Sequence, residues 1–97
     1  MRAKKRLEFS EDALIDTADI SHFYAVERGN VRAAKKVEIT IFKAAENLEF
    51  TPELGKHGSI KGTRELVITA YPYTIIYKLT PSKVIVLNVI HQSRQHP

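Results

Sequence analysis

The sequence predicts one small α+β domain whose elements run β-α-α-β-β-β. We expect an antiparallel sheet of about four strands with a helical hairpin packed on one face. Three observations predict this fold. The 97 residues suffice for a single core, so residues 1–97 form one domain. The first half repeats apolar residues at three- and four-residue steps, which is the helical period. The second half alternates every two residues and is rich in β-branched side chains, which is typical of strands.

The chain opens with a short strand and a first helix. Leu7 and Phe9 alternate with charged neighbours, so a strand is expected here. Ser10 is the expected N-cap of the following helix, because Glu11 and Asp12 then lie where acidic side chains favour the helix dipole. The apolar stripe of this helix consists of Ala13, Thr17, Ile20, Phe23 and Tyr24.

A second helix follows directly and folds back on the first. Gly29 supplies a left-handed stop, and Asn30 caps the next helix. The helix ends before Pro52, because the residue preceding a proline avoids helical angles. A corner this short predicts an antiparallel hairpin. The stripe of the second helix consists of Ala34, Val37, Ile41, Ala44, Ala45 and Leu48.

Three consecutive strands are expected after an irregular, glycine-containing basic loop over residues 53–62. Their turns, at Pro72 and at residues 80–83, are short, so the strands should pair antiparallel. The last strand is apolar on both faces, which predicts a central place in the sheet. The three strands are predicted over residues 64–69, 73–79 and 84–90.

The charge is uneven along the chain. Residues 1–53 hold nine bases and ten acids, a net charge of −1, whereas residues 54–97 hold six bases and one acid, a net charge of +5. This asymmetry indicates an anionic partner, which could be nucleic acid, a nucleotide or an acidic protein segment. A merely solvated basic face is the alternative interpretation.

Composition also excludes several classes of protein. With no cysteine, the chain has no disulfide framework, no thiolate zinc site and no thiol nucleophile. It has no apolar run of about 20 residues and no secretory leader, so we expect a cytoplasmic protein that does not bind the membrane.

Several short motifs, in their order and spacing, carry a resemblance to a known family. They are Asn30-Val-Arg-Ala-Ala, Thr63-Arg-Glu-Leu-Val-Ile, Tyr73-Thr-Ile-Ile-Tyr-Lys and the ending Val89-Ile-His-Gln-Ser-Arg-Gln-His-Pro. Together they resemble the RelE/ParE superfamily of bacterial toxins over nearly the whole chain. The resemblance implies the same small sheet and hairpin, a type II toxin-antitoxin system, and a cognate antitoxin that wraps and neutralises the toxin.

The superfamily divides by target. RelE-like members cut messenger RNA on the ribosome, and ParE-like members poison DNA gyrase. The RelE pattern places two lysines on the second strand and an arginine at the start of the third, but this chain has Glu65, Val67 and Thr74 there. Only Arg94 keeps an expected base. The resemblance therefore favours a ParE-like toxin that binds gyrase without cleaving a bond; the alternatives are a ribosome-dependent mRNA endoribonuclease and a member without toxicity.

A ribonuclease needs a base, an acid and cations beside the scissile phosphate. If the chain is a ribonuclease, the candidate catalytic residues are His91, Arg94 and Glu65. An imidazole with a pKa of about 6.5 serves as base or acid at neutral pH. In the alternative interpretation, His91 only ends a strand and hydrogen-bonds a neighbouring carbonyl.

Arg64, Lys78 and Arg94 are the candidates for contact with the target or with phosphate. The structural alternative for Arg64 is an ion pair with a helix carboxylate such as Glu49 or Glu53.

Other polar and aromatic residues have structural interpretations as well. Neither His22 nor His57 has metal-ligand spacing, and no metal or cofactor is predicted. Tyrosines between bases stack nucleobases in some proteins, but burial under the hairpin is favoured for Tyr71, Tyr73 and Tyr77. The N-terminal bases either touch nucleic acid or belong to a frayed terminus; they are Arg2, Lys4, Lys5 and Arg6.

Overall fold

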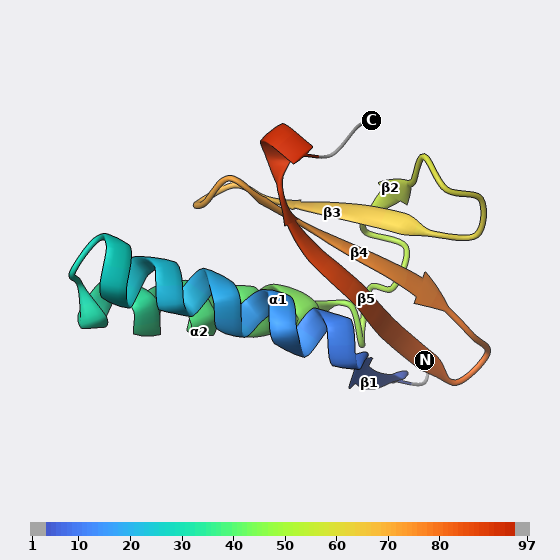
Figure 1. Cartoon of the computed structure of the whole chain (residues 1–97). Coiled ribbons are helices and arrows are strands. Elements are labelled where there is room, and N and C mark those ends of the chain that lie inside the picture. The colour runs from blue at the N-terminus through green and yellow to red at the C-terminus, as the bar shows by residue number, and fades with distance from the viewer. Residues whose placement is uncertain (1–3, 95–97) are drawn as a thin grey trace.

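The computed structural model describes residues 4–94, and for Arg94 the backbone alone. Two helices pack as a hairpin against one face of a twisted sheet, and the other face of the sheet is free of helices (Figure 1). No helix of the described residues is long and apolar enough to cross a membrane. The elements are β1 (Arg6–Phe9), α1 (Glu11–His22), the π-helical turn η1 (Phe23–Glu27), α2 (Val31–Asn47), β2 (Lys56–His57), β3 (Arg64–Ile68), β4 (Tyr73–Leu79), β5 (Lys83–His91) and the 3-10 turn η2 (Gln92–Arg94).

The sheet has five strands in the order β1-β5-β4-β3-β2, so the prediction of about four antiparallel strands needs correction. The three strands predicted from the second half are confirmed, and β5 is central, between β1 and β4. Two features differ. The glycine-containing loop holds the short strand β2, which pairs with β3, and β1 runs parallel to β5. Short turns fix the direction of consecutive strands, but no turn fixes the direction of β1.

The pairing of β1 with β5 joins the two ends of the chain. Leu7 lies opposite Val84, and Phe9 lies opposite Val86, so both rows face the core. The Lys5 amide donates to the Glu49 carbonyl at 3.0 Å, which extends the attachment before the strand begins. The expectation of a frayed N-terminus is therefore wrong for residues 4–6, and Arg2 lies outside the described residues.

Both helices begin at their predicted caps. The Ser10 hydroxyl and the Asn30 side chain each accept a hydrogen bond from the amide three residues ahead, at 3.0 and 2.9 Å. The first helix does not run unchanged to its stop, because it widens at Phe23 into the π-helical turn η1. Gly29 then takes the predicted left-handed conformation, with φ of 61°.

The core lies between the hairpin and the sheet. The predicted alternation along β4 is confirmed, because Tyr73, Ile75 and Tyr77 are buried in it and Leu79 packs at its margin. The predicted helix stripes supply the other layer. Their fully buried members are Ala13, Val37, Ile41, Ala45 and Leu48.

A bulge in β5 changes which side chains face the core. Tyr77 pairs with Val86 while Ile76 pairs with Asn88, so Leu87 is the extra residue. Such a bulge bends the strand and strengthens its twist.

Beyond the bulge, α1 replaces β1 as the neighbour of β5. The Ser10 hydroxyl donates to the Leu87 carbonyl at 2.8 Å. One Asp16 carboxylate oxygen accepts from the Val89 amide at 2.9 Å and from the Asn88 side chain at 3.1 Å. The start of α1 is therefore fixed to the strand by polar contacts as well as by apolar packing.

Replacing Ser10 by Ala removes a helix cap and the hydrogen bond to Leu87 together. We expect S10A to lower the free energy of unfolding by about 1–2 kcal/mol, measured by urea denaturation. Ser82→Ala is the matched control, because Ser82 lies exposed in the β4–β5 turn and should change stability by less than about 0.5 kcal/mol. Equal effects of the two substitutions would contradict this role for Ser10.

Candidate functional site

A groove of about 470 Å³ opens between the last turns of the first helix and the ends of β4 and β5. We call it the His91 groove. Apolar side chains form its floor, and charged side chains of both signs lie along it. The polar and aromatic lining residues that matter below are Asp16, Asp19, Phe23, Tyr24, Arg28, Tyr73 and His91.

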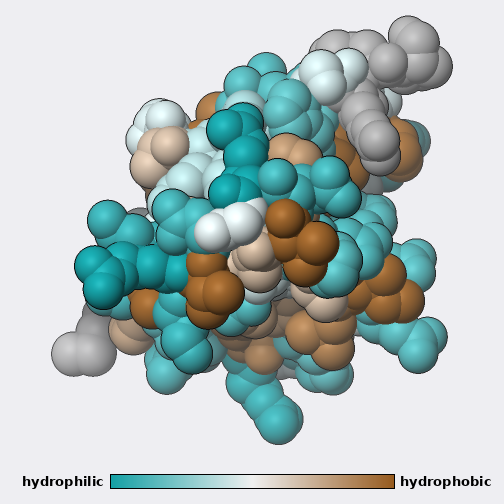
Figure 2. All heavy atoms as spheres, turned by 60° about the vertical axis from the view of Figure 1, so that its left-hand side comes forward, coloured by the Kyte–Doolittle hydropathy of each residue, from teal (hydrophilic) through white to brown (hydrophobic). Residues whose placement is uncertain are grey.

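The π-helical turn η1 builds one wall of this groove. Phe23 and Tyr24 contact edge to face with ring centroids 5.4 Å apart, and the Arg28 guanidinium lies 5.6 Å from the Phe23 ring centre. π-helical turns are rare and are frequent at functional sites. Where the hairpin turns, brown apolar groups alternate with teal hydrophilic ones, so the surface seen there has no continuous apolar patch (Figure 2).

Tyr73 lies at the floor of the groove and is only 6% exposed. Burial, followed by a hydrogen bond with the Tyr24 side chain, raises the pKa of Tyr73 to about 12. Its hydroxyl is therefore neutral at physiological pH. The predicted burial of Tyr73 and Tyr77 is confirmed, whereas Tyr71 is half-buried beside Tyr24, with ring centroids 6.0 Å apart.

His91 ends β5 and its ring is exposed at the groove. The ring meets Tyr73 edge to face, with centroids 5.5 Å apart. The Ser93 amide donates to Nδ1 of His91 at 3.1 Å, and the Ser93 hydroxyl lies 2.8 Å from the same nitrogen. The neutral ring therefore carries its proton on Nε2. The expected strand end is found, but the hydrogen-bond partner is Ser93 rather than a carbonyl.

The open face, meaning the face of the sheet away from the helices, holds the three positions where the resemblance to RelE-like toxins leads us to look for cations. Glu65 and Val67 lie on β3, and Thr74 lies directly opposite Val67 on β4. Glu65 is 5% exposed and accepts a hydrogen bond from the Ser59 amide at 3.1 Å. The hydroxyl of buried Thr74 has no hydrogen-bond partner among the described residues. None of the three side chains is cationic.

The structure does not bring Glu65 and His91 together. Ile68, Tyr73 and His91 lie in one row across β3, β4 and β5, so their side chains point to the helix-covered face. Glu65 lies three residues before Ile68 on the same strand, and successive side chains alternate between faces. Glu65 and His91 therefore lie on opposite faces of the sheet.

Arg64 supports the segment that follows the second helix. It lies opposite Tyr77, on the helix-covered face, and its Nη1 donates to the carbonyls of Gly55 at 2.7 Å and Glu53 at 3.4 Å. The Tyr77 hydroxyl donates to the Pro52 carbonyl at 2.7 Å and accepts from the Gly55 amide at 2.9 Å. Burial is the main cause that raises the pKa of Tyr77.

The other two candidate cations lie elsewhere. Lys78 follows Tyr77 on β4, so it points to the open face, where it is exposed. Arg94 lies in η2, directly after β5, and its side chain is outside the described part of the chain. Arg64 and Lys78 therefore do not form one phosphate site. Glu49, the other carboxylate considered for Arg64, lies 3.7 Å from the Lys4 ammonium.

A second groove, of about 380 Å³, lies between α2 and β3. We call it the α2–β3 groove. Its apolar walls include Leu54, which is 58% exposed, and the half-buried Leu66, and Lys43 lies along the helix side. The register of β2 covers only the first two residues of β3, so the edge from Leu66 to Ile68 has no partner strand within residues 4–94.

Sequence analysis missed the groove residues Asp16, Tyr24 and Arg28 as polar site residues. The sequence gives one signal, for Asp16: at the helical period it lies beside the apolar stripe of Ala13 and Thr17 rather than on the opposite, solvent-facing side of the helix. Among the described residues, no group of three or more His, Asp or Glu side chains is arranged to hold a metal ion.

Comparison with known proteins gives consistent likenesses over nearly the whole chain. Residues 7–96 match the family described as the ParE toxin of type II toxin-antitoxin system, parDE. The inferred toxin Y4kP of Sinorhizobium fredii strain NGR234 is 34% identical over 95 residues, which are 98% of this chain and 96% of that protein.

Solved structures share the fold. The chromosomal ParDE system of P. aeruginosa matches with a TM-score of 0.82 at 19% identity, over 91% of this chain and 96% of that one. The RelBE2 toxin-antitoxin complex of Mycobacterium tuberculosis matches with a TM-score of 0.62 at 18% identity, over 94% of each chain. The E. coli DinJ-YafQ complex gives 0.57 at 17% identity, over 97% and 99%.

The raised pKa of Tyr73 makes stability depend on pH in a defined direction. An unfolded tyrosine has a pKa of about 10, so Tyr73 contributes its full stability below that pH and loses it as the pH rises toward 12. Tyr24→Phe removes the hydrogen bond and should lower the pKa of Tyr73, measured by phenolate absorbance against a variant that also carries Tyr73→Phe. Tyr71→Phe is the control and should leave this pKa unchanged; a shift as large as that of Tyr24→Phe would contradict the assigned cause.

Proposed function

The chain belongs to the family of ParE toxins of type II toxin-antitoxin systems, and we propose that it arrests growth by binding DNA gyrase without cleaving RNA. It would act in the cytoplasm, where its target lies, until a cognate antitoxin neutralises it. The observation that carries this proposal is that Glu65, Val67 and Thr74, the positions where the resemblance to RelE-like toxins implies cations, lie together on the open face and none is cationic.

In this arrangement the chain does not meet two requirements of a ribonuclease. Cleavage of a phosphodiester needs cations where negative charge develops, and these three places supply an acid, an apolar group and a hydroxyl. It also needs an acid and a base that both reach the same substrate within about 3 Å. Glu65 and His91 lie on opposite faces of the sheet, so they do not meet this condition together.

A binding role assigns different tasks to the candidate cations. Arg64 keeps residues 53–55 in place through their carbonyls, so its contribution is structural. Lys78 is exposed and offers its charge to a partner, whereas the side chain of Arg94 lies outside the described part of the chain. Exposed charges of this kind mainly steer association and set its salt dependence.

A supercoiling assay and primer extension on translated message separate the two kinds of toxin. We expect the purified chain to inhibit gyrase and to leave the message without new ends. His91→Ala should retain the inhibition, because His91 has no part in a non-catalytic mechanism. New message ends that vanish in His91→Ala and Arg94→Ala would instead establish the endoribonuclease, and absence of growth arrest on induction would establish a non-toxic member.

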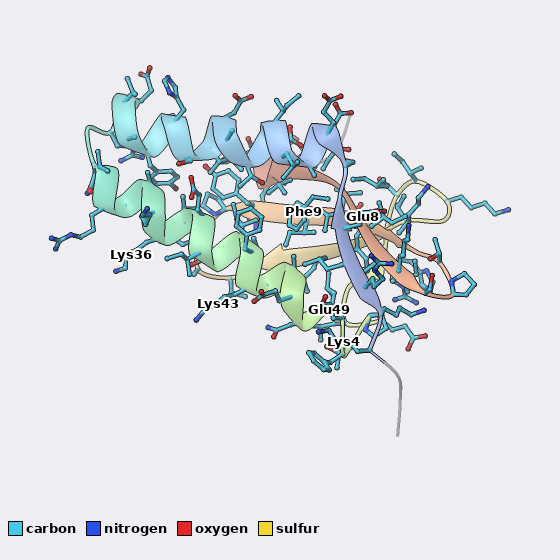
Figure 3. The ribbon with its side chains drawn as sticks, turned by 90° about the horizontal axis from the view of Figure 1, so that it is seen from below. Lys4, Glu8, Phe9, Lys36, Lys43 and Glu49 are labelled. Carbon is cyan, nitrogen blue, oxygen red and sulfur yellow. The ribbon has the colours of Figure 1, made fainter. Side chains whose placement is uncertain are left out.

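We further propose that the antitoxin occupies the α2–β3 groove with an extended or amphipathic acidic segment. The β3 edge from Leu66 to Ile68 offers backbone groups to an added strand, and the apolar walls accept its side chains. Lys43 lies in the groove, and Lys36 lies two turns earlier on the same side of α2 (Figure 3). Two lysines beside an apolar groove favour acidic residues in the partner, and they disfavour a second copy of this chain.

Charge reversal at the groove tests this partner. Lys43→Glu should weaken binding of the product of the neighbouring reading frame at least tenfold, with the loss shrinking at high salt, in a titration calorimetry measurement. Lys61→Glu is the matched control, because Lys61 lies exposed in the loop before β3 and does not line the groove. An equal loss in both variants, or a salt-independent loss, would contradict docking at this groove.

A further inference from the structure

The parallel pairing of β1 with β5 gathers basic residues from both ends of the chain at one end of the sheet. Arg6 lies directly opposite Lys83, and Lys78 lies on the neighbouring strand on the same open face. Lys5 extends the group, because its ammonium donates to the carbonyls of Thr80 and Pro81 at 2.7 and 2.9 Å. We call Lys5, Arg6, Lys78 and Lys83 the cationic pole.

Little negative charge balances this pole. Glu8 lies beside it, and its carboxylate is 3.5 Å from the Lys83 ammonium. Glu49 also lies near the pole, but its carboxylate already contacts the Lys4 ammonium at 3.7 Å and accepts a hydrogen bond from the Leu7 amide at 3.2 Å. Figure 3 shows Lys4 and Glu49 at the same end of β1. Arg6 and Lys78 form no ion pair with any residue in the described range, and both are exposed.

The arrangement is costly for the fold alone. Like charges directly opposite each other on paired strands are destabilising, and Arg6 and Lys83 are such a pair, of which only Lys83 has a carboxylate beside it. Arg6 and Lys83 meet in the pairing that attaches the N-terminal strand β1 to β5, and an uncharged residue at either position would avoid their repulsion. A cationic surface raises the local concentration of anionic partners, so this pole can attract a polyanion.

The shape of the pole fits a phosphate backbone better than a folded protein partner. Neither the His91 groove nor the α2–β3 groove is lined by a residue of the pole, and an apolar recess is where a protein segment would bury its side chains. β1, β5 and β4 are adjacent strands, so Arg6 and Lys78 lie two strand spacings apart, about 10 Å, and are also offset by two residues along the strands. Cations spaced in this way can contact separate phosphates of one DNA strand.

We propose that the cationic pole binds the backbone of double-stranded DNA, independently of base sequence. The choice of DNA rests on the proposed function, because a gyrase inhibitor acts beside the duplex that gyrase holds. Contact with that duplex would raise the local concentration of the toxin at its target and would leave the His91 groove and the α2–β3 groove free.

The test is the salt dependence of binding of the full chain to a short labelled duplex, without gyrase, by fluorescence anisotropy. Each lost phosphate contact should reduce the slope of log affinity against log salt by about 0.9. We expect this reduction in Arg6→Gln, Lys78→Gln and Lys83→Gln. Lys35→Gln, which removes the same charge from the first half of α2, should leave the slope unchanged.

Thermal unfolding of each variant checks that the fold is intact. Arg6→Gln relieves the like-charge pair, so its Tm should not fall. Lys83→Gln also removes the exposed ion pair with Glu8, so its Tm should change little. Absence of DNA binding by the unaltered chain, or slopes in the pole variants equal to that of Lys35→Gln, would overturn the proposal. Tighter pole-dependent binding of an RNA duplex would overturn the choice of DNA, and pole-dependent binding of an acidic protein alone would replace nucleic acid as the partner.

Measuring both DNA binding and inhibition of supercoiling tests the DNA contact and the proposed function separately. Inhibition of supercoiling by a chain that does not bind DNA would refute the DNA contact and leave the gyrase proposal intact. DNA binding by a chain that does not inhibit supercoiling would refute the gyrase proposal and leave the pole as a nucleic-acid site.

Discussion

The pairing of the first strand with the last is the contact on which the rest of the structure depends. It adds Leu7 and Phe9 to the core, and it places Ser10 where the hydroxyl both caps α1 and binds the Leu87 carbonyl. The helical hairpin therefore begins at a fixed point on the sheet. Because the pairing joins residues more than 75 positions apart, it closes nearly the whole chain into one cooperative unit.

The limits of that pairing create the His91 groove. β1 ends at Phe9, so β5 continues past it, and Asp16 on α1 takes up the Val89 amide that a longer β1 would have bonded. The bulge at Leu87 then turns His91 onto the helix-covered face, beside Tyr73. The same bulge separates His91 from Glu65 by the thickness of the sheet. The chain thus retains the fold of its superfamily while its polar groups lie on different faces of the sheet.

Much of the fold was predictable because it depends on local sequence patterns. The caps at Ser10 and Asn30, the left-handed Gly29 and the three consecutive strands each depend on a few neighbouring residues. The parallel direction of β1 was not predictable in this way. No turn constrains it, and four charged or apolar residues pair equally well in either direction until the hairpin fixes where the strand starts.

The sequence by itself determined the class of fold, the burial of Tyr73 and Tyr77, and a family resemblance that assigns a toxin. It also showed that the second half is basic, but not where that charge lies. Only the tertiary structure decided that Glu65 and His91 face opposite sides, that Arg64 is held by backbone carbonyls, and that Arg6 stands beside Lys83. The reason is that side-chain proximity across a sheet depends on strand order, register and bulges, which arise from contacts distant in sequence.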